Sequence, residues 1–283
     1  MSAKLVAGRY EIERPLGHGA FATVDLARDV ELDRPVALKR LADNLSRDED
    51  LRARFLREAR LAARLSHPNV VRVYDVGEDD DRPFIAMEYV DGQTLGDLVA
   101  RRGPLPPEEV VEIGVQACRA LAAAHDAGLV HRDVKSHNLF LEGDRTLKLG
   151  DFGIAVGLEG TRMTVAGTVL GTAAYLAPEQ ARGEEVTAAA DIYALGVVLV
   201  ELLTGTPDRD ARLYGPLGDV VARCLAEDPR ARPASAAELA AELAAASPSA
   251  RTMPLPERPT RIATQIKATP RRRPRHRGTF VLV

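Results

Sequence analysis

Alternating hydrophobic and polar residues fill short runs in the N-terminal third of the chain, whereas helical spacing dominates most of the remaining two thirds. The alternating runs predict β-strands at residues 10–16, 25–28, 35–41, 70–76 and 83–87. Between the third and fourth strands, apolar residues at helical spacing predict a helix with one buried face at 50–65. The N-terminal part is therefore expected to be a five-stranded sheet with one main helix.

Longer segments further on predict helices. Pro106 and Pro107 open an amphipathic segment at 110–127, and Gly128 stands where a helix C-terminus favours glycine. The segment 188–203 is apolar on nearly all sides, which is typical of a buried central helix. Two more helices are expected, at 215–221 and 235–246. The fold class is therefore α+β, with strands first and helices after them.

Composition and charge divide the chain into two regions. The 283 residues, 46% of them hydrophobic, are enough for a sizeable core. The net charge of −3 is uneven: residues 247–283 have nine Lys and Arg against one acidic residue, a net charge of +8, so residues 1–246 carry −11. The tail is rich in proline and has too little apolar surface to fold alone. We expect a folded acidic domain at 1–246 and a disordered basic tail at 247–283.

The cysteines and the absence of long apolar runs bear on the compartment. Cys118 and Cys224 lie far apart in apolar helical segments, without CxxC spacing. This indicates buried thiols in a reducing compartment rather than a disulfide or a metal site. No secretory signal opens the chain, and no apolar run approaches the roughly 20 residues of a membrane span. A cytoplasmic protein is expected.

Candidate chemistry is concentrated in one hairpin-sized stretch, 131–153. Asp133, Lys135 and Asn138 come before a short apolar run, and Asp151 follows a turn and a second apolar run. Two carboxylates, an amide and an amine suit a site that holds metal ions, an anionic substrate and a hydroxyl nucleophile together.

A glycine loop and a lysine near the N-terminus are weaker signals. Gly17 and Gly19 lie between two predicted strands, where free backbone amides can bind phosphate oxygens, although plain hairpin turns share this pattern. Lys39 lies in a short apolar strand, and an edge-strand lysine with its amine in water has the same signature. Glu58 lies in the predicted helix and could be one of many exposed charges.

These motifs together resemble those of protein kinases. In chain order the motifs are G-x-G at 17–19 with Val24, V-A-L-K at 36–39, H-R-D-x-K-x-x-N at 131–138, D-F-G at 151–153 and A-P-E at 177–179. Ala22 replaces the third glycine of the glycine-rich loop. The match covers about residues 8–246. The run at 171–180 and the Ala- and Arg-rich composition resemble bacterial eukaryotic-like Ser/Thr protein kinases.

The resemblance implies a bilobal α+β fold with ATP bound between the lobes. It places a five-stranded N-lobe at about 8–89, a hinge at 88–92 and a mainly helical C-lobe at 93–246. ATP would bind with Mg²⁺, or with Mn²⁺ as the alternative ion. The implied ATP-binding residues are Leu16, Gly17, His18, Gly19, Ala20, Val24, Ala37, Lys39, Met87, Glu88 and Val90.

The family pattern also implies roles for the charged residues. Asp133 would orient the substrate hydroxyl and act as its base, and Lys135 would contact the transferred phosphate, which favours Ser and Thr as acceptors over Tyr. Lys39 would contact the α- and β-phosphates and pair with Glu58. The implied metal ligands are Asn138 and Asp151.

Threonines fill the loop between D-F-G and A-P-E. Arg132 directly precedes Asp133 and could pair with a phosphothreonine, so we predict regulatory phosphorylation at Thr164 first, and then at Thr168 or Thr161. Other residues are implied to support the active conformation. They are Thr172, which would touch Asp133 and Lys135, Asp191, which would hold the catalytic-loop backbone, and the pair of Glu179 and Arg232.

The sequence departs from typical kinases after Gly205. Only residues 206–214 replace a longer insert that contains a docking helix, so the C-lobe is expected to be shortened and its docking surface altered. The tail, with its basic cluster at 271–277, resembles a juxtamembrane segment. Attraction to an anionic membrane and folding back onto the acidic domain are both open, whereas nucleic acid is not expected because no aromatic residues interleave the cluster.

The expected function is transfer of the γ-phosphate of ATP to Ser and Thr hydroxyls of proteins, in bacterial signalling. The expected partners are protein substrates and a second copy of the chain, through trans-autophosphorylation. Two alternatives remain open. A pseudokinase would bind nucleotide with little turnover, and a small-molecule phosphotransferase would share the Asp-to-Asn loop but not Lys135 or the A-P-E segment.

Overall fold

The computed structural model describes residues 5–19, 21–152, 172–209, 212–213 and 215–247. These residues lie within one structural unit, Met1–Arg251, and the second unit, Thr252–Val283, lies outside them. Several predictions therefore lie outside the described residues. They concern Ala20, the phosphorylation sites Thr161, Thr164 and Thr168, the side chain of Thr172, and the basic tail.

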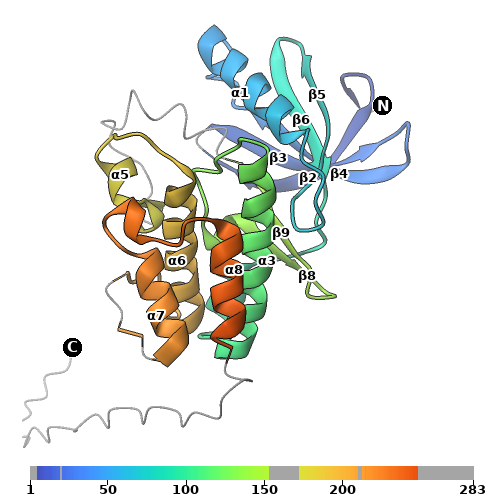
Figure 1. The fold of residues 1–283 in the computed structure, drawn as a ribbon. Helices are drawn as coiled ribbons and strands as arrows, with labels where there is room; N and C mark the ends of the chain where they lie inside the picture. The colour runs from blue at the N-terminus through green and yellow to red at the C-terminus, as the bar shows by residue number, and fades with distance from the viewer. Residues whose placement is uncertain (1–4, 20, 153–171, 210–211, 214, 248–283) are drawn as a thin grey trace, which may run out of the picture. The chain divides into compact units, whose positions relative to one another are not determined.

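An antiparallel sheet forms the N-lobe, with strand order β1-β2-β3-β4-β6-β5 (Figure 1). The sheet has six strands rather than the predicted five, because Leu5 and Val6 pair with β2 across a turn that holds Ala7 and Gly8 at positive φ. The strands are β1 (Leu5–Val6), β2 (Tyr10–His18), β3 (Ala22–Asp29), β4 (Arg34–Leu41), β5 (Val73–Asp79) and β6 (Arg82–Glu88).

The fourth predicted strand begins later than expected. Val70 forms a parallel bridge with Leu149, and the Val71 amide donates to the Leu149 carbonyl at 2.9 Å. This backbone therefore joins the C-lobe, and β5 starts only at Val73. The apolar pattern marked the segment as extended but could not show which sheet it would join.

The helix of the N-lobe, α1 (Glu49–Ala62), packs against β5 and β6 (Figure 1). Its N-cap is Asp48, whose side chain accepts a hydrogen bond from the Leu51 amide. The buried face of the helix, with Phe55 and Ala59, forms one hydrophobic cluster with Leu41 and Ile85. This cluster fixes the position of α1 on the sheet.

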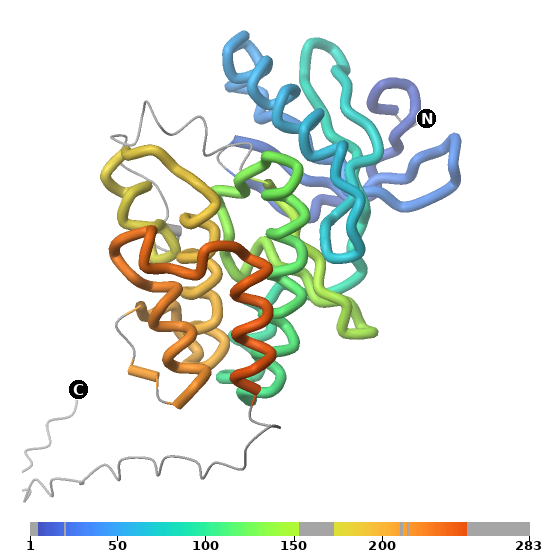
Figure 2. Tube along the Cα trace, viewed as in Figure 1, coloured from blue at the N-terminus to red at the C-terminus, as the bar shows by residue number. Residues whose placement is uncertain are grey.

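Helices form the C-lobe around α6 (Ala188–Thr204), in which every residue from Ala190 to Leu202 is buried. Both α6 and α8 (Ala236–Ala245) pack against α3 (Pro107–Asp126), as Figure 2 shows. The remaining helices are α2 (Leu95–Arg102), α5 (Pro178–Ala181) and α7 (Gly215–Cys224), with 3₁₀ turns at Ser136–Asn138, Thr172–Tyr175 and Pro229–Ala231. The hydrophobic pattern did not predict α2, which is too short to show a clear period.

A small three-stranded sheet connects Asn138, just before its strand β8, to Asp151, just after its strand β9. Its strands are β7 (Gly92–Thr94), β8 (Leu139–Glu142) and β9 (Leu147–Leu149). The first helix after the buried α6 is α7, since Gly205 ends α6 at φ +87° and the described residues 205–209 and 212–213 contain no helix. The C-lobe is thus shortened at this point, as the sequence predicted.

Candidate functional site

A buried carboxylate of α6 holds the backbone of the loop at 131–138, which we call the catalytic loop. Asp191 is 1% exposed, and its two oxygens accept hydrogen bonds from the amides of His131 and Arg132, both at 2.8 Å. The ring of His125 lies 2.8 Å from the same carboxylate. These bonds hold Arg132 at φ +68°, a left-handed conformation that residues with a Cβ usually avoid.

The loop brings Asp133, Lys135 and Asn138 together. The Lys135 Nζ atom lies 2.8 Å from Oδ2 and 3.1 Å from Oδ1 of Asp133. The Asn138 side-chain nitrogen donates to the Asp133 carbonyl at 2.8 Å and to its Oδ2 at 3.0 Å. Because Nδ2 is used in this way, the amide oxygen of Asn138 is the atom left for a cation.

Asp151 lies at the end of the same stretch and contacts the N-lobe. Its Oδ1 accepts a hydrogen bond from Nζ of Lys39, on β4, at 2.9 Å. Burial by itself would raise the pKa of Asp151, but the charge of Lys39 and its hydrogen bond outweigh burial and lower that pKa below its usual value. The carboxylate is therefore ionised at neutral pH, and its second oxygen is left for a cation.

These donors fit a magnesium ion. A carboxylate and an amide oxygen are hard ligands of the kind that Mg²⁺ prefers, and nucleotide phosphates commonly complete its shell. Within the described part of the chain, no group of three or more His, Cys, Asp or Glu side chains is placed to hold a metal ion. The two predicted ligands, Asn138 and Asp151, lie at the start and just beyond the end of the β8–β9 hairpin.

The predicted pair of Lys39 and Glu58 is not formed in this conformation. Lys39 bonds to Asp151 instead, and Oε2 of Glu58 is buried without a hydrogen-bond partner among the described residues. Burial raises the pKa of Glu58, and the opposing charges of Arg132, Arg57 and Arg54 do not cancel this effect. Of the two carboxylates that the sequence placed near Lys39, the structure therefore pairs Asp151 with it and leaves Oε2 of Glu58 without a hydrogen bond from any described residue.

The described residues that the resemblance implies for ATP lie on β2, β3, β4 and β6, in the loop after β2 and in the connection that follows β6. Gly17 and His18 end β2 and pair with Val24 and Thr23 of β3, and the Gly19 amide closes the loop by donating to the Ala22 carbonyl at 2.9 Å. Leu16 also lies on β2 and is exposed. Residues 12–18 of β2 are all exposed, so this end of the strand is open to solvent.

The hinge end of this surface is built by β4 and β6. Ala37 pairs with Met87 across these strands. The Glu88 amide donates to the Arg72 carbonyl at 2.8 Å, so a bond from Glu88 to a base must use its carbonyl oxygen. Val90 follows in the connection to β7 and is partly exposed.

A buried ion pair fixes the segment that begins after residue 171. Glu179, on α5, accepts hydrogen bonds of 2.6 and 2.8 Å from Arg232, and both side chains are almost fully buried. Arg232 also donates to the carbonyls of Ala226 and Ala189, each at 2.9 Å. Burial by itself would raise the pKa of Glu179, but the hydrogen bond and the charge of Arg232, with smaller contributions, together hold that pKa below its usual value.

Sequence reasoning missed residues that connect this segment to the catalytic loop. Gln180 donates to the carbonyl of the strained Arg132 at 3.1 Å and accepts from the Ala177 amide at 3.2 Å. Glu201 bonds to the hydroxyls of Ser136 and Tyr175. No local pattern marks these side chains, although Glu201 stands out, with Asp191, as one of the two charged residues in an otherwise apolar helix.

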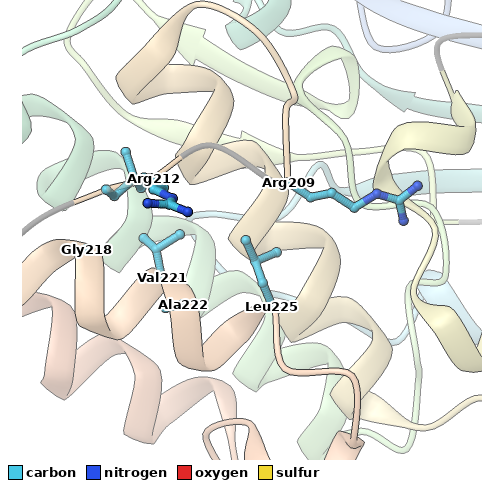
Figure 3. A pocket seen from close by; sticks show the side chains of 7 residues that line it. Arg209, Arg212, Gly218, Val221, Ala222 and Leu225 are labelled. Carbon is cyan, nitrogen blue, oxygen red and sulfur yellow. The ribbon is translucent and has the colours of Figure 1, made fainter.

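A hollow of about 390 Å³ lies beside the short segment that connects α6 to α7 (Figure 3). Its apolar surface comes from Leu213, Val221 and Leu225, and Arg209 and Arg212 lie at its sides. None of its lining residues belongs to the catalytic loop. A second hollow of about 410 Å³ borders the hinge through Glu88 and Lys148, whose side chains form an ion pair at 2.7 Å.

Comparisons with known proteins agree with this geometry. Residues 10–213 match the model of the protein kinase domain. The chain is 42% identical over 266 residues to serine/threonine-protein kinase PknB of Mycobacterium leprae, covering 84% of this chain and 43% of PknB. It is 48% identical over 202 residues to serine/threonine-protein kinase PrkC of Bacillus subtilis, covering 71% of this chain and 31% of PrkC.

Solved structures show the same fold. The PknI kinase domain of Mycobacterium tuberculosis superposes with a TM-score of 0.70 at 35% identity, covering 87% of this chain and 98% of that one. The chain spans less than half the length of the two curated relatives, at 43% and 31%. On the family match and these relatives, the chain belongs to the protein kinase family, and its described residues have the bilobal α+β kinase fold.

Proposed function

We propose that the chain transfers the γ-phosphate of ATP to serine and threonine hydroxyls of proteins. The observation that carries this proposal is the catalytic loop, which brings the Asp133 carboxylate within 2.8 Å of the Lys135 amine and 3.0 Å of the Asn138 amide. These contacts support the proposal because they bring the three side chains proposed as base, phosphate-binding cation and metal ligand next to one another. The names of the relatives PknB and PrkC point to the same acceptor class.

The loop residues divide the reaction between them. Asp133 accepts the proton of the acceptor hydroxyl while the oxygen of that hydroxyl attacks the γ-phosphorus. The bond from phosphorus to the β,γ-bridging oxygen then breaks and ADP is released. Lys135 places a positive charge beside the transferred phosphoryl group. Asn138 and Asp151 would hold Mg²⁺, or Mn²⁺ in its place, and this ion supplies positive charge to the phosphates when bound.

The nucleotide would lie between the glycine loop and the hinge. We assign its phosphates to the loop at 16–20 with Val24, and its base to Ala37, Met87, Glu88 and Val90. Lys39 would contact the α- and β-phosphates. Because Lys39 now bonds to Asp151, nucleotide binding and the approach of α1 would redistribute these contacts, and Glu58 would then pair with Lys39.

Phosphorylation of the loop at 153–171 is proposed as the regulatory step. Arg132, held at φ +68° beside Asp133, would pair with a phosphothreonine. We propose Thr164 as the first site and Thr168 or Thr161 as the next, modified in trans by a second copy. Thr172 would contact Asp133 and Lys135 in the active state. Mass spectrometry after incubation with Mg²⁺ and ATP should find phosphothreonine there, and an active enzyme without it would contradict this step.

A second candidate is a nucleotide-binding pseudokinase or scaffold. The unpaired Glu58 and the short segment between α6 and α7 favour it, since the first leaves the lysine clamp unformed and the second alters substrate docking. A transfer assay separates the two functions. A small-molecule phosphotransferase is separated by the same assay, because its labelled product would not be protein.

The decisive experiment measures transfer from radiolabelled ATP to protein and to small molecules by wild type and by Asp133→Asn. The matched control is Asp219→Asn, because Asp219 is an exposed aspartate on α7. We expect labelled Ser and Thr with wild type and the control, and a loss of at least about a hundredfold with Asp133→Asn. Wild-type transfer no greater than that of Asp133→Asn would overturn the proposed activity.

The place of the protein in the cell is also a proposal. No helix among the described residues is long and apolar enough to cross a membrane. We propose that the kinase domain works in the cytoplasm and that the basic tail holds it near anionic lipid. Sedimentation with anionic vesicles, with and without residues 271–283, tests this. Equal soluble fractions would contradict it.

A further inference from the structure

Three buried polar side chains from three segments meet behind the catalytic loop. Ser136 lies in the 3₁₀ turn of this loop, Tyr175 lies in the 3₁₀ turn before α5, and Glu201 lies on α6. The Ser136 hydroxyl lies 3.0 Å from Oε1 of Glu201, and the Tyr175 hydroxyl lies 2.6 Å from Oε2. We call these residues the hydroxyl–carboxylate cluster. It is absent from the set of residues that the kinase motifs assign.

The carboxylate of this cluster has no cationic partner among the described residues. Glu201 is 7% exposed and Ser136 is fully buried. The other buried carboxylates of the C-lobe have stronger partners: Glu179 pairs with Arg232, and Asp191 bonds to a histidine and two backbone amides. Since a buried carboxylate without bonds is costly, the two hydroxyl groups are what stabilises Glu201 in place.

The hydrogen atoms in the cluster can be assigned. Each hydroxyl has one proton, and the contacts of 3.0 and 2.6 Å both end on the carboxylate. The two hydroxyl oxygens also lie 3.1 Å apart, but the carboxylate of Glu201 only accepts, so each hydroxyl that contacts it is the donor of that contact. Burial, together with the bond to Glu201, raises the pKa of Tyr175, so its hydroxyl remains a donor. Both oxygens of Glu201 are thus occupied.

The position of the cluster along α6 gives the catalytic loop a second anchor. Asp191 holds the start of the loop at His131 and Arg132, and Glu201 holds its end at Ser136. The two carboxylates are separated by about 15 Å along one helix, at about 1.5 Å per residue. Because α6 is buried along its length, the loop is fixed at both ends to one rigid element.

Asp133 and Lys135 lie between these two anchors. Ser136 directly follows Lys135, and the Asn138 amide closes the turn by donating to the Lys135 carbonyl at 2.9 Å. A shift of Ser136 would therefore move the amine and the amide that contact the Asp133 carboxylate. Tyr175 extends the same restraint to the segment between Thr172 and α5.

We propose that Ser136 is a positioning residue for phosphoryl transfer, acting through Glu201 and jointly with Tyr175. This inference rests on the proposed kinase function and deepens it. Ser136 is fully buried, so its role is to position other residues rather than to contact the substrate. Its hydroxyl sets the position of Lys135 and Asn138 and connects them to the segment before α5.

The test compares Ser136→Ala, Ser136→Thr and Tyr175→Phe with a matched control, Tyr10→Phe. Tyr10 is also buried, and its hydroxyl also donates to a carboxylate, that of Asp75 at 2.8 Å, but it lies in the N-lobe sheet. We expect Ser136→Ala and Tyr175→Phe to lower kcat about tenfold with the KM for ATP changed less than about twofold. Ser136→Thr keeps the hydroxyl and should retain kcat within about threefold.

A structural role alone would give a different pattern. Wild-type kcat in Ser136→Ala, or an equal loss of kcat in Tyr10→Phe, would overturn the proposal. Should Ser136→Ala fail to fold, the kcat of Tyr175→Phe is compared with that of Tyr10→Phe, and an equal loss in both would overturn the proposal. If the wild-type protein transfers no phosphate, the proposed function has failed instead.

A second measurement tests the cluster without activity. Unfolding of wild type, the two single variants and the double variant Ser136→Ala/Tyr175→Phe forms a double-mutant cycle. We expect the two losses of stability to be non-additive, because both hydroxyls act on one carboxylate. Additive losses would contradict the cluster, whatever the enzyme does.

Discussion

Replacing Arg232 by alanine should destabilise the kinase domain more than any surface substitution. The guanidinium lies against Glu179 with two hydrogen bonds of 2.6 and 2.8 Å, and it also donates to the carbonyls of Ala226 and Ala189. Glu179 is 3% exposed, so water cannot replace the lost partner. Breaking a buried pair of this kind costs about 3–5 kcal/mol. Since a domain has about 5–15 kcal/mol in total, the variant should be close to unfolding.

The assay is urea unfolding at pH 7 of wild type, Arg232→Ala and Arg223→Ala. The last is the matched control, because Arg223 forms exposed ion pairs with Glu238 and Glu242. The double variant Arg232→Met/Glu179→Leu should recover most of the loss, since it removes both charges and leaves neither one unpaired. A loss in Arg232→Ala no larger than that in Arg223→Ala would refute the reasoning.

The pH dependence gives an independent check. In wild type the pKa of Glu179 lies below its usual value, so the stability from the pair is present above about pH 4.5 and is lost as pH falls through the folded pKa. In Arg232→Ala the Glu179 carboxylate is buried without a cation, so its pKa should rise. Protonation at low pH then removes the cost of burying its charge. The difference between the two proteins should therefore shrink as pH falls from 7 toward 3.

The remaining predictions concern packing and the lysine clamp. Gly92→Ala should cost about 1–3 kcal/mol in unfolding experiments, because its Cβ would clash with the carbonyl oxygen of Leu141, whereas the Cβ of Gly143→Ala meets no atom within 4 Å. Glu58→Gln should raise the melting temperature at pH 7, since burial disfavours the carboxylate, yet slow phosphoryl transfer at least about tenfold; a lowered melting temperature would contradict this. Lys39→Met should lose stability at pH 7, and less so as pH falls through the lowered pKa of Asp151; a loss independent of pH would contradict the pair.

Most elements of the fold could be predicted from the sequence, because their periods are local properties of the chain. The apolar residues of α6 leave no polar side, and Pro107 and Gly128 mark the ends of α3. The elements that were not predicted correctly have no clear hydrophobic period. The strand β1 has two residues, and the segment at Val70 is extended in either sheet, so its partner Leu149 could not be deduced.

The candidate site divides in the same way. The sequence by itself determined the groups of the catalytic loop, because Asp133, Lys135 and Asn138 are neighbours in the chain and one turn brings them together. Only the tertiary structure decided which carboxylate bonds to Lys39, because Asp151 and Glu58 lie in different segments of the chain. The packing of α1 against the sheet sets how far Glu58 lies from Lys39.

The anchors of the loop were also decided in three dimensions. Glu201 gains its role from a hydroxyl 65 residues away, and Gln180 from a carbonyl 48 residues away. A local pattern reports which residues are buried, but not which buried donor meets which acceptor. That choice depends on how α6 lies against the loop, and it determines whether the chemistry that the motifs encode is held in place.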